Sequence, residues 1–207
     1  MHVQIDHPCV QHKLAIIRDV ETGHKRFREL ATEITKFLCY EALKHIRTRE
    51  VDVQTPLATA RCHKIDTDIV VVPILRAGVG MLEGILELVP TARVGFVGLY
   101  RDEETKQPVS YYERFPSQVE GGTCILIDPM LATGGSTAAA IDVLKKAGAR
   151  KIVVICIVTC EEGLTLVEEA HPDVPIYTAS IDERLDENKY IVPGLGDAGD
   201  RLFGTSH

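Results

Sequence analysis

The turn formed by residues 128–136 has the residue types of an anion-binding site. It follows an apolar run at residues 124–127, precedes an alanine-rich segment, and consists of Asp128, Pro129, Met130, Leu131, Ala132, Thr133, Gly134, Gly135 and Ser136. The first N–H groups of a helix lack intrahelical partners and the helix dipole is positive there, so both favour a phosphate. Glycines let the backbone approach the phosphate, and Thr133 and Ser136 add hydroxyl donors. The pattern predicts a phosphate site, and the lack of Gly-Lys-Ser/Thr argues against the P-loop of a nucleoside triphosphatase.

Asp128 makes this turn unusual, because a carboxylate repels a phosphate. An ionised carboxylate accepts hydrogen bonds, so it suits a ligand that also carries diol hydroxyls. The combination indicates a ribose phosphate. A structural alternative stays open on these residues alone, namely a strand, turn and helix in which Ser136 is the N-cap and the glycines only allow a tight turn.

Two arginines could bind further negative charge. Arg76 follows the apolar run 69–75, and Arg101 opens a long charged segment. A guanidinium can bind phosphate oxygens through two parallel hydrogen bonds, so either arginine could contact a diphosphate. The alternative for Arg76 is a solvated strand end, and for Arg101 a surface charge beside acidic residues, which contributes little.

The segments around these residues alternate between two patterns. Apolar runs at residues 69–75, 94–99, 124–127, 152–158 and 176–180 have the length and aliphatic content of buried strands. Residues 79–88, 137–147 and 162–170 suit helices, and residues 12–46 also have helical spacing of apolar side chains. This alternation predicts an α/β fold with an open parallel sheet covered on both faces. The carboxyl ends of parallel strands meet at one edge, where ligands bind, and that edge would carry Arg76 and Asp128.

Two segments interrupt the alternation. Residues 101–122 are charged, contain Pro108 and Pro116, and have a length typical of lids or hairpin arms. The tail from residue 194 is rich in glycine, so it is either a frayed terminus or a segment that holds its backbone against a flat ligand. The sequence has no internal repeat or low-complexity linker, which predicts one domain over residues 1–207.

Composition narrows the functional classes. The net charge of -7, the 5% aromatic content and the lack of tryptophan argue against a nucleic-acid-binding protein. No apolar run approaches the roughly 20 residues of a membrane helix, and the first residues lack the pattern of a secretory signal. The six cysteines include no Cys-x-x-Cys pair, which favours reduced structural thiols in a cytoplasmic protein.

The order Asp-Pro-Met-Leu-Ala-Thr-Gly-Gly-Ser at residues 128–136 resembles the binding signature of the uracil phosphoribosyltransferases, a branch of the type I phosphoribosyltransferases. Most of the wider group has two acidic residues at the start of this signature, and Pro129 stands in the second place here, as in the uracil branch. The resemblance continues through residues 73–78, 103–105, 177–182 and 193–200, and through residues 7–8 and 25–30. It therefore covers nearly the whole chain. Ser110 departs from it, since the family commonly has proline there.

The resemblance implies a core with N-terminal helices, a long β-arm or flexible loop and a C-terminal hood. It implies that Arg76, Arg101, Asp128 and Asp197 are the catalytic residues. The residues that it implies for binding 5-phosphoribosyl 1-diphosphate are Arg76, Arg101, the whole turn 128–136 and Asp197. Uracil would contact the backbone around Ile191, Gly196, Asp197 and Ala198.

The implied reaction transfers phosphoribosyl from 5-phosphoribosyl 1-diphosphate to N1 of uracil, which gives UMP and diphosphate. Mg²⁺ would be held by substrate oxygens and water, with no direct protein ligand. The family also implies a homo-oligomer, dimeric or larger, and GTP as a candidate effector. Two alternatives remain, a non-catalytic regulator that binds RNA or nucleotide and an enzyme of the same fold that acts on another base.

Overall fold

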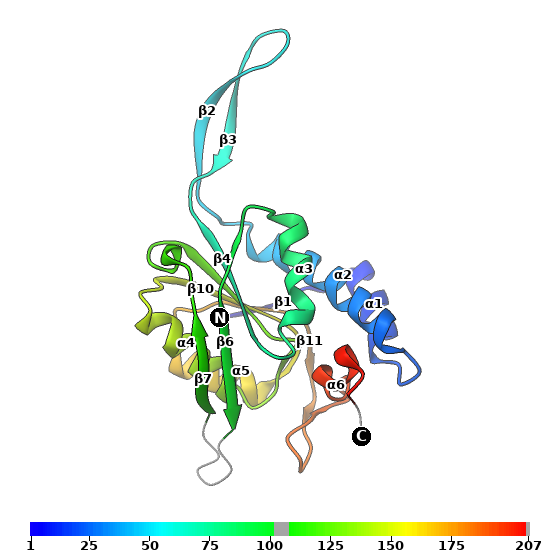
Figure 1. Cartoon of the computed structure of the whole chain (residues 1–207). Coiled ribbons are helices and arrows are strands. Elements are labelled where there is room, and N and C mark those ends of the chain that lie inside the picture. Colours follow the sequence, from blue (N-terminus) through cyan, green and yellow to red (C-terminus); the bar gives the residue numbers. More distant parts are fainter. Residues whose placement is uncertain (102–107, 206–207) are drawn as a thin grey trace.

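A computed structural model of the protein describes residues 1–101 and 108–205. Its central sheet has the strand order β1-β11-β10-β8-β4-β6-β7, with β5 beside β4 and β9 beside β10 (Figure 1). Neighbouring strands are parallel except β6 and β7, which are antiparallel. The strand bounds are β1 His2–Gln4, β4 Ile69–Leu75, β5 Arg93–Val94, β6 Phe96–Arg101, β7 Pro108–Arg114, β8 Thr123–Ile127, β9 Met130–Leu131, β10 Lys151–Cys160 and β11 Ile176–Asp182.

Helices cover both faces of this sheet, as the continuous apolar strands predict. Along β8, Ile125 and Ile127 pack with α1, α2 and α3 on one face, whereas Cys124 and Leu126 pack with α4 and α5 on the other. Figure 1 shows the two helical layers on opposite sides of the strands. The helix bounds are α1 Pro8–Arg18, α2 His24–Ala42, α3 Val79–Leu88, α4 Gly135–Lys146, α5 Glu161–Ala170 and α6 Ala198–Phe203. The expected α/β architecture is therefore confirmed.

The helical structure expected over residues 12–46 is confirmed in part, because the chain turns between α1 and α2. Asp19 has an extended ψ of 128° at the end of α1. The hydroxyl of Thr22 then donates to the carbonyl of Ile16, at 2.6 Å, and satisfies one of the terminal carbonyls of α1. Gly23 begins the next helix as its N-cap. Apolar spacing continues through both helices, so periodicity alone did not reveal the break.

Two hairpins complete the fold. The segment expected at residues 101–122 to form a lid or hairpin arm contains β7, which pairs with β6, and the short helix η1 Ser117–Val119. The connection at residues 102–107 lies outside the described residues. A second hairpin, β2 Thr48–Gln54 with β3 Thr59–Ile65, projects from the body of the protein (Figure 1). This hairpin was not predicted, because its strands are mostly exposed and contain no apolar run.

A two-stranded ribbon, β12 Arg184–Leu185 with β13 Ile191–Val192, leads to the C-terminal helix α6. None of the helices within residues 1–101 and 108–205 combines the length and the apolar character that crossing a membrane requires.

Candidate active site

The carboxyl ends of β4 and β8 bring Arg76 and Asp128 to the same edge of the sheet. The two strands are neighbours, with Pro73 opposite Ile127. The loop after β4 packs directly on the end of β8, since a Cβ placed on Gly78 would lie 2.5 Å from the carbonyl oxygen of Ile127. The two segments that the sequence singled out are thus adjacent, and a glycine is needed where they meet.

Residues 128–136 lead directly into α4, whose first turn has unsatisfied N–H groups. The N-cap is Gly134, with φ +81°, and no side chain caps the helix. A Cβ at this position would lie 2.7 Å from the carbonyl oxygen of Gly163, so both backbone conformation and space require glycine. Helical hydrogen bonding starts only at the Ala138 N–H, which donates to Gly134. Because Ser136 lies inside the helix, the structural alternative with Ser136 as N-cap is wrong.

Two side chains at the end of β10 contact the carbonyls of this turn. The hydroxyl of Thr159 donates to the carbonyl of Leu131 at 2.8 Å, and the thiol of Cys160 contacts the carbonyl of Ala132 at 3.3 Å. Both side chains are completely buried. Since the carbonyl groups are engaged there, the N–H groups at the start of α4 remain for an anion. Thr159 and Cys160 were not predicted as site residues, because a threonine and a cysteine directly after the apolar run 152–158 are ordinary strand residues by sequence.

Asp128 follows the last residue of β8 and is half-buried as a residue. Burial raises its pKa to about 7, against the opposing effect of a hydrogen bond from the N–H of Met130. A carboxyl group with such a pKa changes protonation state near neutral pH. Perturbed carboxyl groups of this kind are concentrated at functional sites.

The side chain of Arg76 is exposed, and no hydrogen bond or ion pair engages it within the described part of the chain. The peptide bond before it, Leu75–Arg76, is cis. Arg101 ends β6, which lies next to β4, and the side chain of Arg101 lies outside the described residues. The site therefore has one described guanidinium that is available to an anion, beside the turn that begins with Asp128.

The C-terminal turn, defined as residues 191–198, is ordered by its own packing and is not a frayed terminus. A Cβ on Gly80 of α3 would lie 2.5 Å from the side chain of Leu202, so α6 packs closely on α3. A Cβ on Gly199 would lie 4.0 Å from that of Ala77, next to Arg76. Asp197 is the N-cap of α6 and accepts a hydrogen bond from the N–H of Asp200 at 2.9 Å. Helix α6, which begins at the end of this turn, thus borders the loop that carries Arg76.

Comparison with known proteins settles the family. The family model described as uracil phosphoribosyltransferase matches residues 3–205. The chain belongs to this family. A curated uracil phosphoribosyltransferase from Symbiobacterium thermophilum is 54% identical and aligns over 98% of both chains. One from Geobacillus kaustophilus is 55% identical, over 97% of this chain and 96% of the relative.

Solved structures share this fold. A protein from Aquifex aeolicus is 40% identical and superposes with a TM-score of 0.94, covering 100% of this chain and 99% of the other. A hypoxanthine phosphoribosyltransferase from Trypanosoma cruzi, in complex with IMP, has a TM-score of 0.51 at 11% identity, over 79% of this chain and 80% of that one. The second similarity concerns the fold alone. The protein is therefore an enzyme of the uracil phosphoribosyltransferase family with the phosphoribosyltransferase fold.

Proposed function

We propose that this enzyme transfers the 5-phosphoribosyl group of 5-phosphoribosyl 1-diphosphate to N1 of uracil, giving UMP and diphosphate. The observation that carries the proposal is the uncapped start of α4 behind Asp128, with Arg76 and the C-terminal turn beside it. A steady-state assay with uracil, 5-phosphoribosyl 1-diphosphate and Mg²⁺ should yield UMP. Turnover of orotate or hypoxanthine without turnover of uracil would exclude this substrate.

The turn 128–136 would bind the phosphorylated ribose. The N–H groups of Gly135, Ser136 and Thr137 suit the 5-phosphate, because they lie in the first turn of a helix without a side-chain cap. The hydroxyls of Thr133 and Ser136 add donors. Asp128 would accept hydrogen bonds from the ribose hydroxyls when its carboxyl group is ionised. Pro129, Met130, Leu131 and Ala132 shape the backbone that connects these two contacts.

The diphosphate would lie against Arg76 and Arg101. No protein nucleophile is needed, because departure of the diphosphate places positive charge on the ribose ring. Uracil N1 then bonds to the ribose carbon that the diphosphate has left, and the N1 proton is lost to water or to the departing diphosphate. Catalysis would rest on the positioning of the reactants and on stabilisation of the leaving charge by the two guanidinium groups. We assign Asp197 to the face of the phosphorylated sugar, since it stands at the border between the C-terminal turn and the loop of Arg76.

The oxygen-rich edge of the site is compatible with Mg²⁺ brought in by the substrate. Mg²⁺ prefers oxygen ligands and keeps several waters, and Asp128 and Asp197 offer carboxylates at this edge. No group of three or more His, Cys, Asp or Glu side chains suited to a metal occurs in the described ranges. We propose that diphosphate oxygens and water would hold the metal, as the family resemblance implies, with Asp197 as a candidate contact to the coordinated water. When bound, the ion would neutralise charge on the leaving diphosphate.

Uracil would be recognised by backbone groups of the C-terminal turn at Ile191, Gly196, Asp197 and Ala198. One edge of uracil presents an acceptor, a donor and an acceptor. Main-chain N–H and C=O groups can complement that order, whereas cytosine reverses part of it and would leave buried polar groups without partners. An assay with cytosine in place of uracil should give no detectable product.

The cellular location, oligomeric state and effector of the enzyme are proposed from its family and composition. We assign it to the cytoplasm as a homo-oligomer, dimeric or larger, with GTP as a candidate effector. The described cysteines are free thiols, which fits a reducing compartment. Light scattering across a GTP titration, with activity measured in parallel, tests the oligomeric state and the effector together. A monomer at all concentrations, or activity that does not respond to GTP, would exclude the corresponding part.

A further inference from the structure

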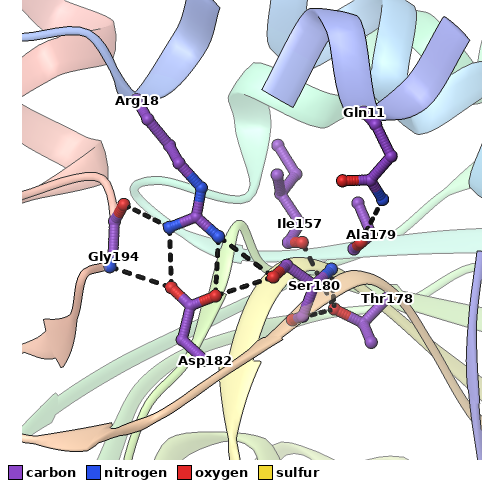
Figure 2. Close-up of polar contacts among 8 residues, drawn as sticks. All are labelled: Gln11, Arg18, Ile157, Thr178, Ala179, Ser180, Asp182 and Gly194. Atoms are coloured by element: carbon purple, nitrogen blue, oxygen red, sulfur yellow. Dashed lines mark hydrogen bonds and ion pairs between the residues drawn. The ribbon is translucent and has the colours of Figure 1, made fainter. Parts of the chain in front are cut away.

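An ion pair between the half-buried Arg18 and the buried Asp182 joins the end of α1 to the end of β11. The guanidinium of Arg18 donates to both carboxylate oxygens of Asp182, at 2.7 and 2.6 Å, and the hydroxyl of Ser180 donates to the same carboxylate at 2.7 Å (Figure 2). Burial acts to raise the pKa of Asp182, but hydrogen bonds from Arg18 and Ser180 outweigh it, and the pKa lies below its usual range. The pair is therefore charged at neutral pH.

This ion pair also holds the peptide groups on both sides of Gly194. The N–H of Gly194 donates to Asp182 at 2.8 Å, and its carbonyl accepts from Arg18 at 2.6 Å (Figure 2). Gly194 has φ +60°, and any Cβ there would collide with the carbonyl of Ile191. The conformation of the C-terminal turn at this point is thus set jointly by a glycine and by two charged side chains that lie 176 and 12 residues away in the sequence.

A second arginine holds the next carbonyl. Arg201 donates to the carbonyl of Leu195 at 2.9 Å and, with its other nitrogen, to that of Asp19 at 2.6 Å. Its guanidinium carbon lies 4.5 Å from the centre of the Phe27 ring, a stacked arrangement that restricts its movement. The carbonyls of Gly194 and Leu195 are therefore both occupied by arginines that are anchored to the N-terminal helices.

The backbone groups that follow Leu195 are not engaged in this way. Among the described residues, no hydrogen bond engages the N–H groups of Gly196, Asp197 and Ala198 or the carbonyl of Gly196. They form a set of three donors and one acceptor. This set includes the two donors and one acceptor needed to pair with the acceptor, donor and acceptor of uracil. Because Arg18 and Arg201 bind the carbonyls of Gly194 and Leu195, those two carbonyls are not available to a ligand. The unpaired groups that follow them are.

We propose that Arg18 and Asp182 are positioning residues for base recognition, which fix the C-terminal turn so that the backbone groups of Gly196 and Ala198 meet the edge of uracil. This inference rests on the proposed function, in which the C-terminal turn binds the base. An ion pair that only joined α1 to β11 would need no contact with Gly194. Here both ions also bind the peptide groups at this glycine, so displacement of either ion moves the turn.

Arg18→Met tests the proposal, because methionine keeps an apolar stem and removes every donor. We expect the KM for uracil to rise about tenfold or more, as displacement of binding groups by about 1 Å is known to do, while the KM for 5-phosphoribosyl 1-diphosphate stays within about threefold. In Arg18→Lys the KM for uracil should lie between those of the wild type and Arg18→Met, since an ammonium can reach one carbonyl but lacks the planar fork. The matched control is Arg93→Met, which breaks an exposed Arg–Asp pair, with Asp68, at the amino end of β4 and β5.

These assays distinguish a failure of the proposed function from a failure of the positioning role of Arg18 and Asp182. If the wild-type protein forms no UMP from uracil, the proposed function fails. If the wild type is active and folded Arg18→Met leaves the uracil KM unchanged, or raises both KM values equally, the positioning role fails. Circular dichroism verifies folding. Should Arg18→Met not fold, Ser180→Ala removes one hydrogen bond to Asp182 and one from Arg18 but leaves the ion pair. An unchanged uracil KM in that folded variant would equally overturn the proposal.

Discussion

The hydroxyl of Thr159 donates to the carbonyl of Leu131 at 2.8 Å and ties the end of β10 to the turn that begins with Asp128. The two residues are also register partners in the parallel pairing of β9 with β10. The pairing of the two strands already fixes the direction of the chain here, so the hydroxyl is not needed for that purpose. It supplies a donor to a buried carbonyl that would otherwise compete with a bound anion for the N–H groups of the same turn.

Thr159→Val should therefore weaken both stability and binding of the diphosphate substrate. Valine preserves the shape but leaves the buried carbonyl of Leu131 without this donor, which costs about 1–3 kcal/mol. We expect a lower melting temperature and a KM for 5-phosphoribosyl 1-diphosphate raised several-fold, with the uracil KM little changed. Thr35→Val is the control, since Thr35 is equally buried but donates to Ala31 within α2. An identical kinetic profile in both variants would refute the role of Thr159.

Gly134→Ala should abolish most of the activity through the backbone. At φ +81° an alanine is strained by roughly 1–2 kcal/mol, and its Cβ would lie 2.7 Å from the carbonyl oxygen of Gly163. The turn must shift, so kcat/KM for 5-phosphoribosyl 1-diphosphate should fall about a hundredfold. Gly121→Ala separates strain from crowding, because Gly121 has φ +85° and open space around its Cβ position. That control should lose some stability and keep its activity. Equal activity in the two variants would contradict the prediction.

The sequence predicted the parts of the fold that depend on local pattern. The strand at residues 69–75 and the helix at residues 79–88 have the bounds expected for β4 and α3. Their chemistry was equally visible, since Arg76 and Asp128 each follow an apolar run at a strand end. The rules for parallel sheets then place both at one edge, and the structure agrees.

The parts that escaped prediction depend on distant contacts. Arg18 belongs to an ordinary helical pattern, and Asp182 ends an ordinary apolar strand. Their pairing links residues 164 positions apart, and no periodicity encodes such a distance. The hairpin of β2 and β3 was missed for a related reason, as its mostly exposed strands carry no burial signal.

Arg76→Met should remove activity without loss of stability. The side chain is exposed and has no partner within the described part of the chain, so its truncation should change the free energy of unfolding by less than about 0.5 kcal/mol. A guanidinium that binds a departing diphosphate supports the transition state, and kcat/KM should fall about a hundredfold or more. Arg150→Met, at an exposed position before the amino end of β10, should leave both quantities unchanged. A drop in kcat/KM of less than about threefold would exclude Arg76 from catalysis.

Asp128→Asn should change how stability depends on pH. Burial raises the pKa of Asp128 to about 7 in the folded protein, whereas an unfolded chain has a value near 3.9. Between these values the unfolded state has lost the proton that the folded state keeps, so this group favours folding at low pH and loses that contribution as pH rises towards 7.

Asparagine carries no such proton. The variant should therefore gain stability relative to wild type between pH 5 and 7, by roughly 1–3 kcal/mol, although it loses turnover because the ionised acceptor for ribose is gone. Urea denaturation of both proteins at pH 5, 6, 7 and 8 measures the difference. A difference that is constant over this range would show that Asp128 titrates at its ordinary pKa.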